Sequence, residues 1–264
     1  MHRLAYLTTR FPSTLAVAQS VLNKLPKQVE SVLELGAGVG TSLWALPFLS
    51  NITLVKKDLG LIEMGQRLKP GPYQCIHADY TQVKEFPKSD LILFSYSIRE
   101  LEEEKAYSLL KTLFQQTLQF LVLIEPGTPK GFERIRNYRE LFIKLNGHII
   151  APCPHTKMSP MEGKNWCHFS ERLSRDRLHR ILKEGELGYE DEKYSYLIIS
   201  KDPFPKSGKR ILRHPQKRSG HITFELCREI GVEKKRFLKK RGMHLKTQSG
   251  LSGGMCSITV FKCF

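Results

Sequence analysis

The sequence has no long apolar segment. Its longest uninterrupted apolar stretches, residues 91–94 and 120–124, are far shorter than the roughly 20 residues that span a bilayer. It also has no internal repeat, and its 41% hydrophobic and 26% charged residues are ordinary globular values that argue against wholesale disorder. We therefore expect a folded protein without a membrane partner, and its 264 residues suit one large domain or two modest ones.

Cysteine is too sparse for a disulfide scaffold. Six cysteines in a chain long enough to build its own core favour a reducing compartment. Acidic residues are absent from residues 1–29, a composition found in organelle transit peptides. Residues 11–25 argue against that interpretation, because Pro12, Ser13 and Thr14 predict a capped helix start before an apolar face. The segment is therefore expected to belong to the fold.

Acidic residues are also too few to balance the basic ones. The chain has 42 Lys and Arg against 26 Asp and Glu, a net charge of +16. Residues 201–264 hold 16 of the basic and 4 of the acidic residues, so most of the excess lies there. Its densest part consists of Lys234, Lys235, Arg236, Lys239, Lys240 and Arg241. Such a run can neutralise phosphates, which predicts RNA binding; the alternative is a solvated basic face without a ligand.

Short β-branched or apolar runs alternate with helical stretches, which predicts a doubly wound α/β sheet. The expected strands are residues 32–35, 52–55, 74–78, 91–95, 120–124, 147–150 and 194–200, with a helix at 129–146. Residues 151–193 form a Cys-rich and His-rich insertion before the last strand, longer than an ordinary connection. We expect one domain over residues 1–202 and a small basic C-terminal extension, residues 203–264, packing back on the insertion.

Three glycines at alternate positions, Gly36, Gly38 and Gly40, directly follow the first expected strand and precede a helix. Glycine lets the backbone turn sharply and approach a ligand, and the helix start offers free N–H groups. A dinucleotide fingerprint would have its third glycine at Thr41, which weakens the interpretation as an oxidoreductase with a nicotinamide cofactor.

The run from Glu34 to Gly40 instead resembles the first motif of class I S-adenosylmethionine-dependent methyltransferases. The resemblance implies a carboxylate after the third strand for the adenine amino group, which Asp79 supplies, and another after the second strand for the ribose. Lys56 and Lys57 stand there instead, before Asp58. Either Asp58 serves by a shift in register or the affinity for the cofactor is poor, because an ammonium cannot accept hydroxyl hydrogen bonds. Ser95 begins the loop where the methyl acceptor would meet the cofactor.

Further motifs resemble more specifically the methyltransferase-like family linked to assembly of the ribosomal small subunit, with bacterial and mitochondrial members. The motifs are Glu125-Pro126-Gly127, Cys153-Pro154-His155, Trp166-Cys167-His168 and Tyr194-Ser195-Tyr196. The resemblance covers about residues 6–230. It implies a Rossmann-like class I methyltransferase fold and association with the small subunit or its RNA.

In members with four cysteines the resemblance also implies a four-iron four-sulfur cluster. Cys153, Cys167 and Cys227 match three of the ligand positions, and the fourth falls on Ser159. Serine is a poor iron ligand beside thiolate. Three alternatives stay open: a cluster completed by Ser159 or by His155 or His168, a zinc ion bound by Cys and His, or no metal.

The sequence therefore leaves two candidate functions. The first is an S-adenosylmethionine-binding methyltransferase of ribosomal RNA, and the second is an inactive, RNA-binding assembly factor that retains the fold. The sequence identifies no catalytic residue and no methylated atom. The expected partners are the small subunit and its RNA, the protein is expected to be a monomer, and the expected compartment is the bacterial cytoplasm or, alternatively, the mitochondrial matrix.

Overall fold

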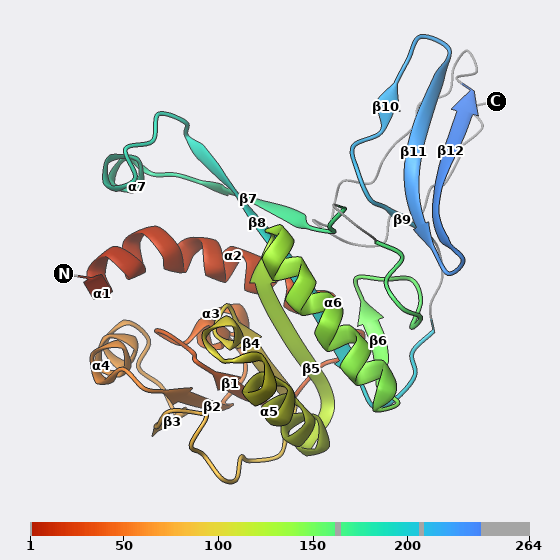
Figure 1. Cartoon of the computed structure of the whole chain (residues 1–264). Helices are drawn as coiled ribbons and strands as arrows, with labels where there is room; N and C mark the ends of the chain where they lie inside the picture. The colour runs from red at the N-terminus through yellow and green to blue at the C-terminus, as the bar shows by residue number, and fades with distance from the viewer. Residues whose placement is uncertain (1, 162–164, 206–208, 239–264) are drawn as a thin grey trace.

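The computed structural model describes residues 2–161, 165–205 and 209–238. A sheet of eight strands organises the chain, in the order β3-β2-β1-β4-β5-β8-β6, with β7 paired to β8 (Figure 1). Its first five strands are β1 (Ser31–Leu35), β2 (Asn51–Lys56), β3 (Gln74–His77), β4 (Ser89–Ser95) and β5 (Thr117–Pro126). They are mutually parallel. The order reverses between β1 and β4, as predicted for a doubly wound sheet.

Of the remaining strands, β8 runs in the opposite direction, whereas β6 and β7 run in the same direction as β5. β8 (Tyr189–Ser200) pairs antiparallel with β5 and with β6 (His148–Ala151). The predicted strand 194–200 lies inside β8, which begins earlier because its first half pairs with β7 (Phe169–Ser174). This hairpin projects beyond the sheet (Figure 1). The sheet has the doubly wound strand order that the sequence predicted, and this order agrees with the Rossmann-like class I methyltransferase fold that the resemblance implies.

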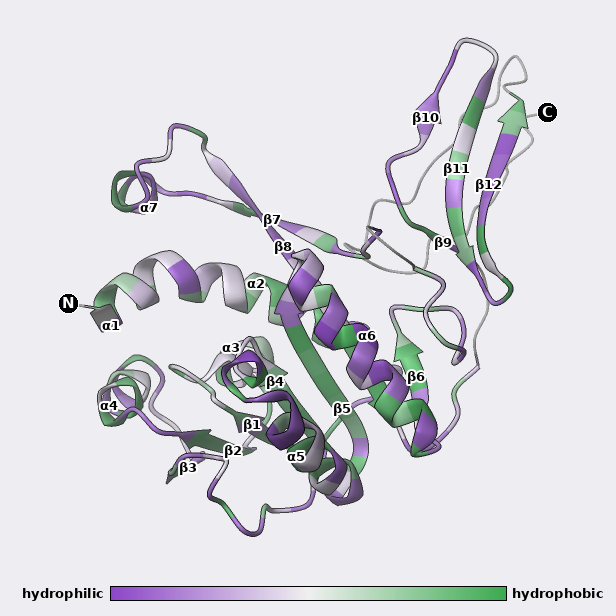
Figure 2. Ribbon diagram, in the orientation of Figure 1, coloured by the Kyte–Doolittle hydropathy of each residue, from purple (hydrophilic) through white to green (hydrophobic). Residues whose placement is uncertain are grey.

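Helices cover both faces of the sheet. Neighbouring residues of a strand point to opposite sides, so the apolar residues of the central strands need cover on each face. On one face, α2 (Phe11–Leu22) and α3 (Thr41–Ala45) pack Val21 and Leu43 against strand residues such as Leu93. On the other face, α5 (Glu103–Gln116) and α6 (Pro129–Lys144) pack Leu110 and Phe142. α4 (Leu59–Leu68) contacts β2 and β3. The central strands are accordingly apolar along their length (Figure 2).

The predicted capped start of the N-terminal helix is wrong. α1 (His2–Ala5) and a π-helical turn, η1 (Tyr6–Arg10), run directly into α2. Arg10 therefore occupies the N-cap position in a helical conformation and makes no side-chain cap hydrogen bond. The Thr14 hydroxyl instead donates to the carbonyl of Arg10 at 3.1 Å. The segment belongs to the fold, as expected, but it begins as a continuous helical arm.

The basic C-terminal extension contains a second, smaller sheet. It consists of β9 (Arg210–Ile211), β10 (Gln216–Lys217), β11 (His221–Arg228) and β12 (Gly231–Leu238), with β11 in the middle. Ile222, Phe224 and Leu226 form its small core. The boundary at residue 202 stays a prediction. Among the described residues, no helix is long and apolar enough to cross a membrane.

Candidate functional site

The three glycines form a turn between β1 and α3 with left-handed backbone conformations. The φ angles of Gly36, Gly38 and Gly40 are 67°, 53° and 92°. A Cβ atom at Gly36 would lie 2.3 Å from Cβ of Ser97, and one at Gly38 would lie 2.5 Å from the hydroxyl of Tyr6. Any side chain here would therefore be both strained and crowded. The absence of a side chain therefore lets Ser97 and Tyr6 pack directly against the turn.

Glu34 and Gly40 shape this turn from behind. The buried Glu34 carboxylate accepts hydrogen bonds from the backbone N–H and the hydroxyl of Ser42, at 2.9 and 2.6 Å. Burial raises the pKa of Glu34, and the bonds from Ser42 oppose that rise. Neither Glu34 nor Gly40 is among the residues that line the cleft.

An open cleft of about 620 Å³ lies in front of the turn, at the carboxyl ends of the parallel strands. Its lining includes Gly36, Gly38, Asp58, Asp79 and Ser95, five of the seven predicted cofactor-binding residues. Sites for small ligands commonly measure roughly 300–1,000 Å³, and in open α/β sheets they lie at this edge. The cleft has the size and the position of a nucleotide-like site.

Two carboxylates of the cleft, Asp58 and Asp79, already have cationic partners. Asp58 caps α4 by accepting from the N–H of Leu61, and it pairs with Arg3 at 2.9 Å. Asp79 accepts from the Thr81 hydroxyl and pairs with Lys57 at 3.0 Å. The bond from Thr81 and then the pair with Lys57 lower the pKa of Asp79 to about 2. Because Arg3 and Lys57 are mostly exposed, each pair contributes only about 0–1 kcal/mol.

Lys56 lies where the ribose carboxylate was expected. Its side chain is buried, and within the described residues Nζ has no hydrogen-bond partner. Burial lowers the pKa of Lys56, while Cys75 and Glu34 act in the opposite direction. A desolvated ammonium is costly and cannot accept from a hydroxyl. Among the residues that line the cleft, the neighbouring Asp58 offers a carboxylate that can accept hydrogen bonds from hydroxyl groups.

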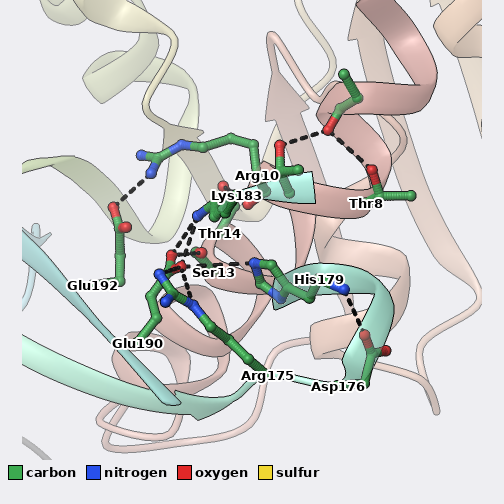
Figure 3. Close-up of polar contacts among 12 residues, drawn as sticks. Thr8, Arg10, Ser13, Thr14, Arg175, Asp176, His179, Lys183, Glu190 and Glu192 are labelled. Carbon is green, nitrogen blue, oxygen red and sulfur yellow. Dashed lines mark hydrogen bonds and ion pairs between the residues drawn. The ribbon is translucent and has the colours of Figure 1, made fainter. Parts of the chain in front are cut away.

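Three tyrosines, Tyr6, Tyr80 and Tyr96, also line this cleft, and none of them was among the predicted site residues. Tyr6 from η1 covers the glycine turn, and burial followed by Glu34 raises its pKa to about 12. Tyr96 follows β4 with a φ of 63°, a strained conformation for a bulky residue. Arg10 lies 4.8 Å above the Tyr96 ring and pairs with Glu192 at 2.8 Å (Figure 3). Burial holds the pKa of Tyr96 well above its usual range, so its phenol stays protonated at neutral pH.

The predicted metal positions converge on a second cavity, of about 30 Å³. Cys153, Ser159, Cys167 and Cys227 all contribute to its lining, and Cys227 arrives from β11. The sulfur of Cys227 lies 3.7 Å from Nε2 of His155. His168 does not line this cavity; its ring stacks on Trp166. The extension therefore delivers a third thiol to the insertion.

Two buried arginines stand beside these thiols. Arg139 donates to the carbonyl oxygens of Lys157 and His155 at 3.0 and 2.9 Å, and its Nη1 atom has no partner among the described residues. Arg210 lies 3.9 Å from the centre of the Phe169 ring and hydrogen-bonds Cys167. No carboxylate pairs with either arginine in the described part of the chain. Buried cations require a compensating anion.

The thiols have not adopted a metal-binding geometry. In the part of the chain that is described, no group of three or more His, Cys, Asp or Glu is placed to hold a metal ion. Burial, followed by Cys153, raises the pKa of Cys227 to about 12. Burial also raises the pKa of Cys167, against the effect of Arg210. The donor chemistry suits a metal–thiolate centre, whereas burial favours the neutral thiols of Cys167 and Cys227 in the present arrangement.

The predicted RNA-binding residues fall partly on β12. Lys234, Lys235 and Arg236 are all exposed, and they pair in register with Glu225, Phe224 and Thr223 of β11. Because successive side chains of a strand alternate, positive charge faces both sides of this small sheet. Lys239, Lys240 and Arg241 lie outside the described residues, as do Cys256 and Cys263.

Known proteins similar to this chain include mitochondrial ones. The human protein named "Ribosome assembly protein METTL17, mitochondrial" is 23% identical over 254 residues, which cover 85% of this chain and 55% of the relative. "Rsm22-cox11 tandem protein 2, mitochondrial" of Schizosaccharomyces pombe is 25% identical over 291 residues, 85% of this chain and 38% of the relative. The chain thus spans about half the length, or less, of these relatives.

Solved structures similar to this one include methyltransferases. The N-methyltransferase NodS from Bradyrhizobium japonicum superposes with a TM-score of 0.47 at 10% identity, covering 74% of this chain and 96% of NodS. Magnesium protoporphyrin IX methyltransferase from Synechocystis, with bound SAM, superposes with a TM-score of 0.44 at 14% identity, covering 73% of this chain and 78% of the enzyme.

A family model described as "Mitochondrial small ribosomal subunit Rsm22" matches residues 1–253. This match includes the glycine turn, the three converging cysteines and the basic strand β12. It covers most of the chain, so the chain belongs to the Rsm22 family of mitochondrial small ribosomal subunit proteins.

Proposed function

We propose that this protein binds S-adenosylmethionine at the glycine turn and acts in assembly of the ribosomal small subunit, on its RNA. The observation that carries the proposal is the turn itself, where two left-handed glycines, Gly36 and Gly38, line an open cleft at the carboxyl edge of the sheet. The human relative is named a ribosome assembly protein, which supports the proposed role in assembly of the small subunit.

The residues of the cleft fit this cofactor. Gly36 and Gly38 line the cleft where its methionine part would lie, Asp58 can accept from the ribose hydroxyls, and Asp79 can accept from the adenine amino group. The cofactor supplies an electrophilic methyl group when bound. Arg3 and Lys57 have to release the two carboxylates, at a cost of about 0–1 kcal/mol per exposed pair. The loop of Ser95 and Tyr96 borders the place where an acceptor would enter.

The second candidate is an assembly factor that keeps the cleft without transferring a methyl group. Two observations favour it: the buried Lys56 stands where a carboxylate was expected, and Tyr6 covers the glycine turn. The two candidates differ in one result. Incubation of small-subunit RNA with S-adenosylmethionine labelled in its methyl group gives labelled RNA only under the first.

RNA binding tests the other half of the proposal. Changing Lys234, Lys235 and Arg236 to Gln removes three exposed charges of β12. We expect affinity for small-subunit RNA to fall about tenfold at low salt, and the logarithmic salt slope to become shallower by roughly 2, because each phosphate contact contributes about −0.7. Filter binding at several salt concentrations measures both quantities.

A matched control removes the same charge elsewhere. Lys111, Lys130 and Lys144 are exposed residues of α5 and α6, and their triple change to Gln lowers the net charge equally. If both triple variants lose affinity to the same extent, binding reflects overall charge and β12 is a solvated face. Lysine on an edge strand such as β12 discourages pairing between molecules. The lysines of β12 would then have this role without binding RNA.

For the cysteine cavity we propose a metal–thiolate centre, an iron–sulfur cluster in preference to zinc. Three thiols on one cavity, an unpartnered Arg139 Nη1 and the buried Arg210 support an anionic occupant. Protein purified without oxygen should then be brown, with broad visible absorption that Cys227→Ala removes and Cys75→Ala retains. Colourless protein with stoichiometric zinc would move the assignment to zinc, and metal-free protein would end it.

For the compartment we propose the mitochondrial matrix. The relatives named above are called mitochondrial, which favours the mitochondrial matrix over the bacterial cytoplasm for this protein. The monomeric state stays a prediction.

A further inference from the structure

The short helix α7 (Arg177–Leu182) buries a polar residue, His179, and exposes its three apolar residues, Leu178, Ile181 and Leu182. It lies at the end of the β7–β8 hairpin, away from the main sheet (Figure 1). Asp176 caps the helix by accepting from the N–H of His179 at 2.7 Å. Helices of globular proteins normally turn their apolar stripe to the core, so this inversion needs a physical reason.

The inner side of α7 is fixed by one carboxylate. Glu190 accepts from Lys183 at 2.6 Å and from Arg175 at 2.6 Å, and its other contacts are the Ser13 hydroxyl at 2.9 Å and the His179 ring at 3.6 Å (Figure 3). Glu190 and His179 are both largely buried. These contacts tie the hairpin to α2 and hold the opposite side of the helix toward solvent.

That outer side is aliphatic. Leu178, Ile181 and Leu182 are 56%, 61% and 49% exposed, and Leu187 from the following loop is 58% exposed. Spacings of three and four residues place the helical members on one surface. Single exposed leucines are common, whereas a group of four on one projecting tip marks an interaction surface. We call these four residues the hairpin tip.

Charges of both signs border the hairpin tip. Arg177, Arg180, Glu184 and Glu186 line a shallow hollow with Ile181. None of the four has an ion-pair partner in the described part of the chain. Glutamates repel a phosphate backbone, and aliphatic side chains offer no ring on which a base can stack. The pattern therefore suits a protein surface that has apolar residues flanked by charges of both signs.

We propose that the hairpin tip docks on a protein component of the small ribosomal subunit, while β12 contacts its RNA. This inference rests on the proposed association with the subunit. The partner would cover Ile181 and Leu182 with apolar side chains and place a carboxylate near Arg177 or Arg180. Two surfaces of different chemistry would thereby fix the orientation of the protein on a ribonucleoprotein.

Site-directed photocrosslinking to purified small subunits tests this inference. A benzophenone side chain replaces Ile181 at the hairpin tip, Lys235 on β12, or Leu68, a partly exposed leucine of α4 that serves as control. We expect the probe at position 181 to label a ribosomal protein, the probe at 235 to label RNA, and the probe at 68 to label neither. Co-sedimentation of each protein with the subunit is measured in parallel.

A double substitution measures how much the hairpin tip contributes to the affinity for the small subunit. Because Leu178 and Ile181 are exposed, Leu178→Ser with Ile181→Ser should leave the melting temperature unchanged and weaken binding to subunits about tenfold or more. Binding to naked RNA should not change. Labelling of RNA from position 181, or no labelling while the protein co-sediments, overturns the docking proposal alone. Absence of co-sedimentation overturns both the docking proposal and the association on which it rests.

Discussion

Gly38→Val is expected to abolish binding of S-adenosylmethionine. Gly38 has a φ of 53°, where a β-branched residue is strongly disfavoured. A Cβ atom there would also lie 2.5 Å from the hydroxyl of Tyr6, so the glycine turn and the helical turn η1, which carries Tyr6, would have to move apart. We expect at least about a hundredfold loss of affinity, which corresponds to roughly 2.7 kcal/mol. Equilibrium dialysis against radiolabelled cofactor measures the loss.

Gly188→Val is the matched control for this variant. A Cβ atom at Gly188 meets nothing within 4 Å, and the residue has no left-handed conformation. Its affinity for the cofactor should equal that of the unaltered protein. Far-UV circular dichroism establishes that both variants are folded. Wild-type affinity in a folded Gly38→Val protein would place the cofactor somewhere other than the glycine turn.

Glu190→Gln is expected to destabilise the protein by roughly 2–4 kcal/mol, because it leaves Arg175, Lys183 and Ser13 around an uncharged group. Only 9% of the Glu190 side chain is exposed, so solvent screens these contacts poorly. Denaturant unfolding monitored by circular dichroism gives the difference. Glu186→Gln, at an exposed position without an ion pair in the described residues, should change stability by less than about 0.5 kcal/mol.

The effect of Glu190 should depend on pH. Burial opposes ionisation, but the hydrogen bonds from Lys183, Arg175 and Ser13 lower the pKa from 4.5 to about 2. A carboxyl group with a lowered pKa stabilises the folded state above its unfolded pKa and loses that contribution as the pH falls toward its folded pKa. The stability difference between wild type and Glu190→Gln should therefore be full at pH 7 and shrink between about pH 5 and pH 2. A constant difference would mean that the carboxylate charge is not responsible.

The main sheet could be predicted because its signals are local. Apolar runs such as residues 91–94 and 120–124 are long enough to identify strands buried on both faces, and they lie inside β4 and β5. The helical arm was missed because Pro12 and Ser13 resemble a start signal, although the preceding residues already form helical turns. The first half of β8 was missed because Glu190, Asp191 and Glu192 are charged. Its pairing with β7 is a contact between segments that no local pattern reveals.

The candidate site was predictable where chemistry follows directly from a residue type. Glycines in sequence identified the turn, and the cysteine motifs identified positions that converge on one cavity. The roles of Tyr6, Arg139 and Arg210 could not be predicted, since each enters its cavity from a distant segment. Glu34 was expected to contact the cofactor, yet it lies behind the turn, because its carboxylate is held by the start of α3.

Isothermal titration of the unaltered protein tests the proposed cofactor site most directly. S-adenosylmethionine and its demethylated product share the groups that Gly36, Gly38, Asp58 and Asp79 would contact, so both should give a saturable heat of binding. A nicotinamide dinucleotide should give none, because Thr41 replaces the third glycine of its fingerprint. No heat from S-adenosylmethionine at millimolar concentration would contradict the cofactor site and leave the non-catalytic assembly factor as the function.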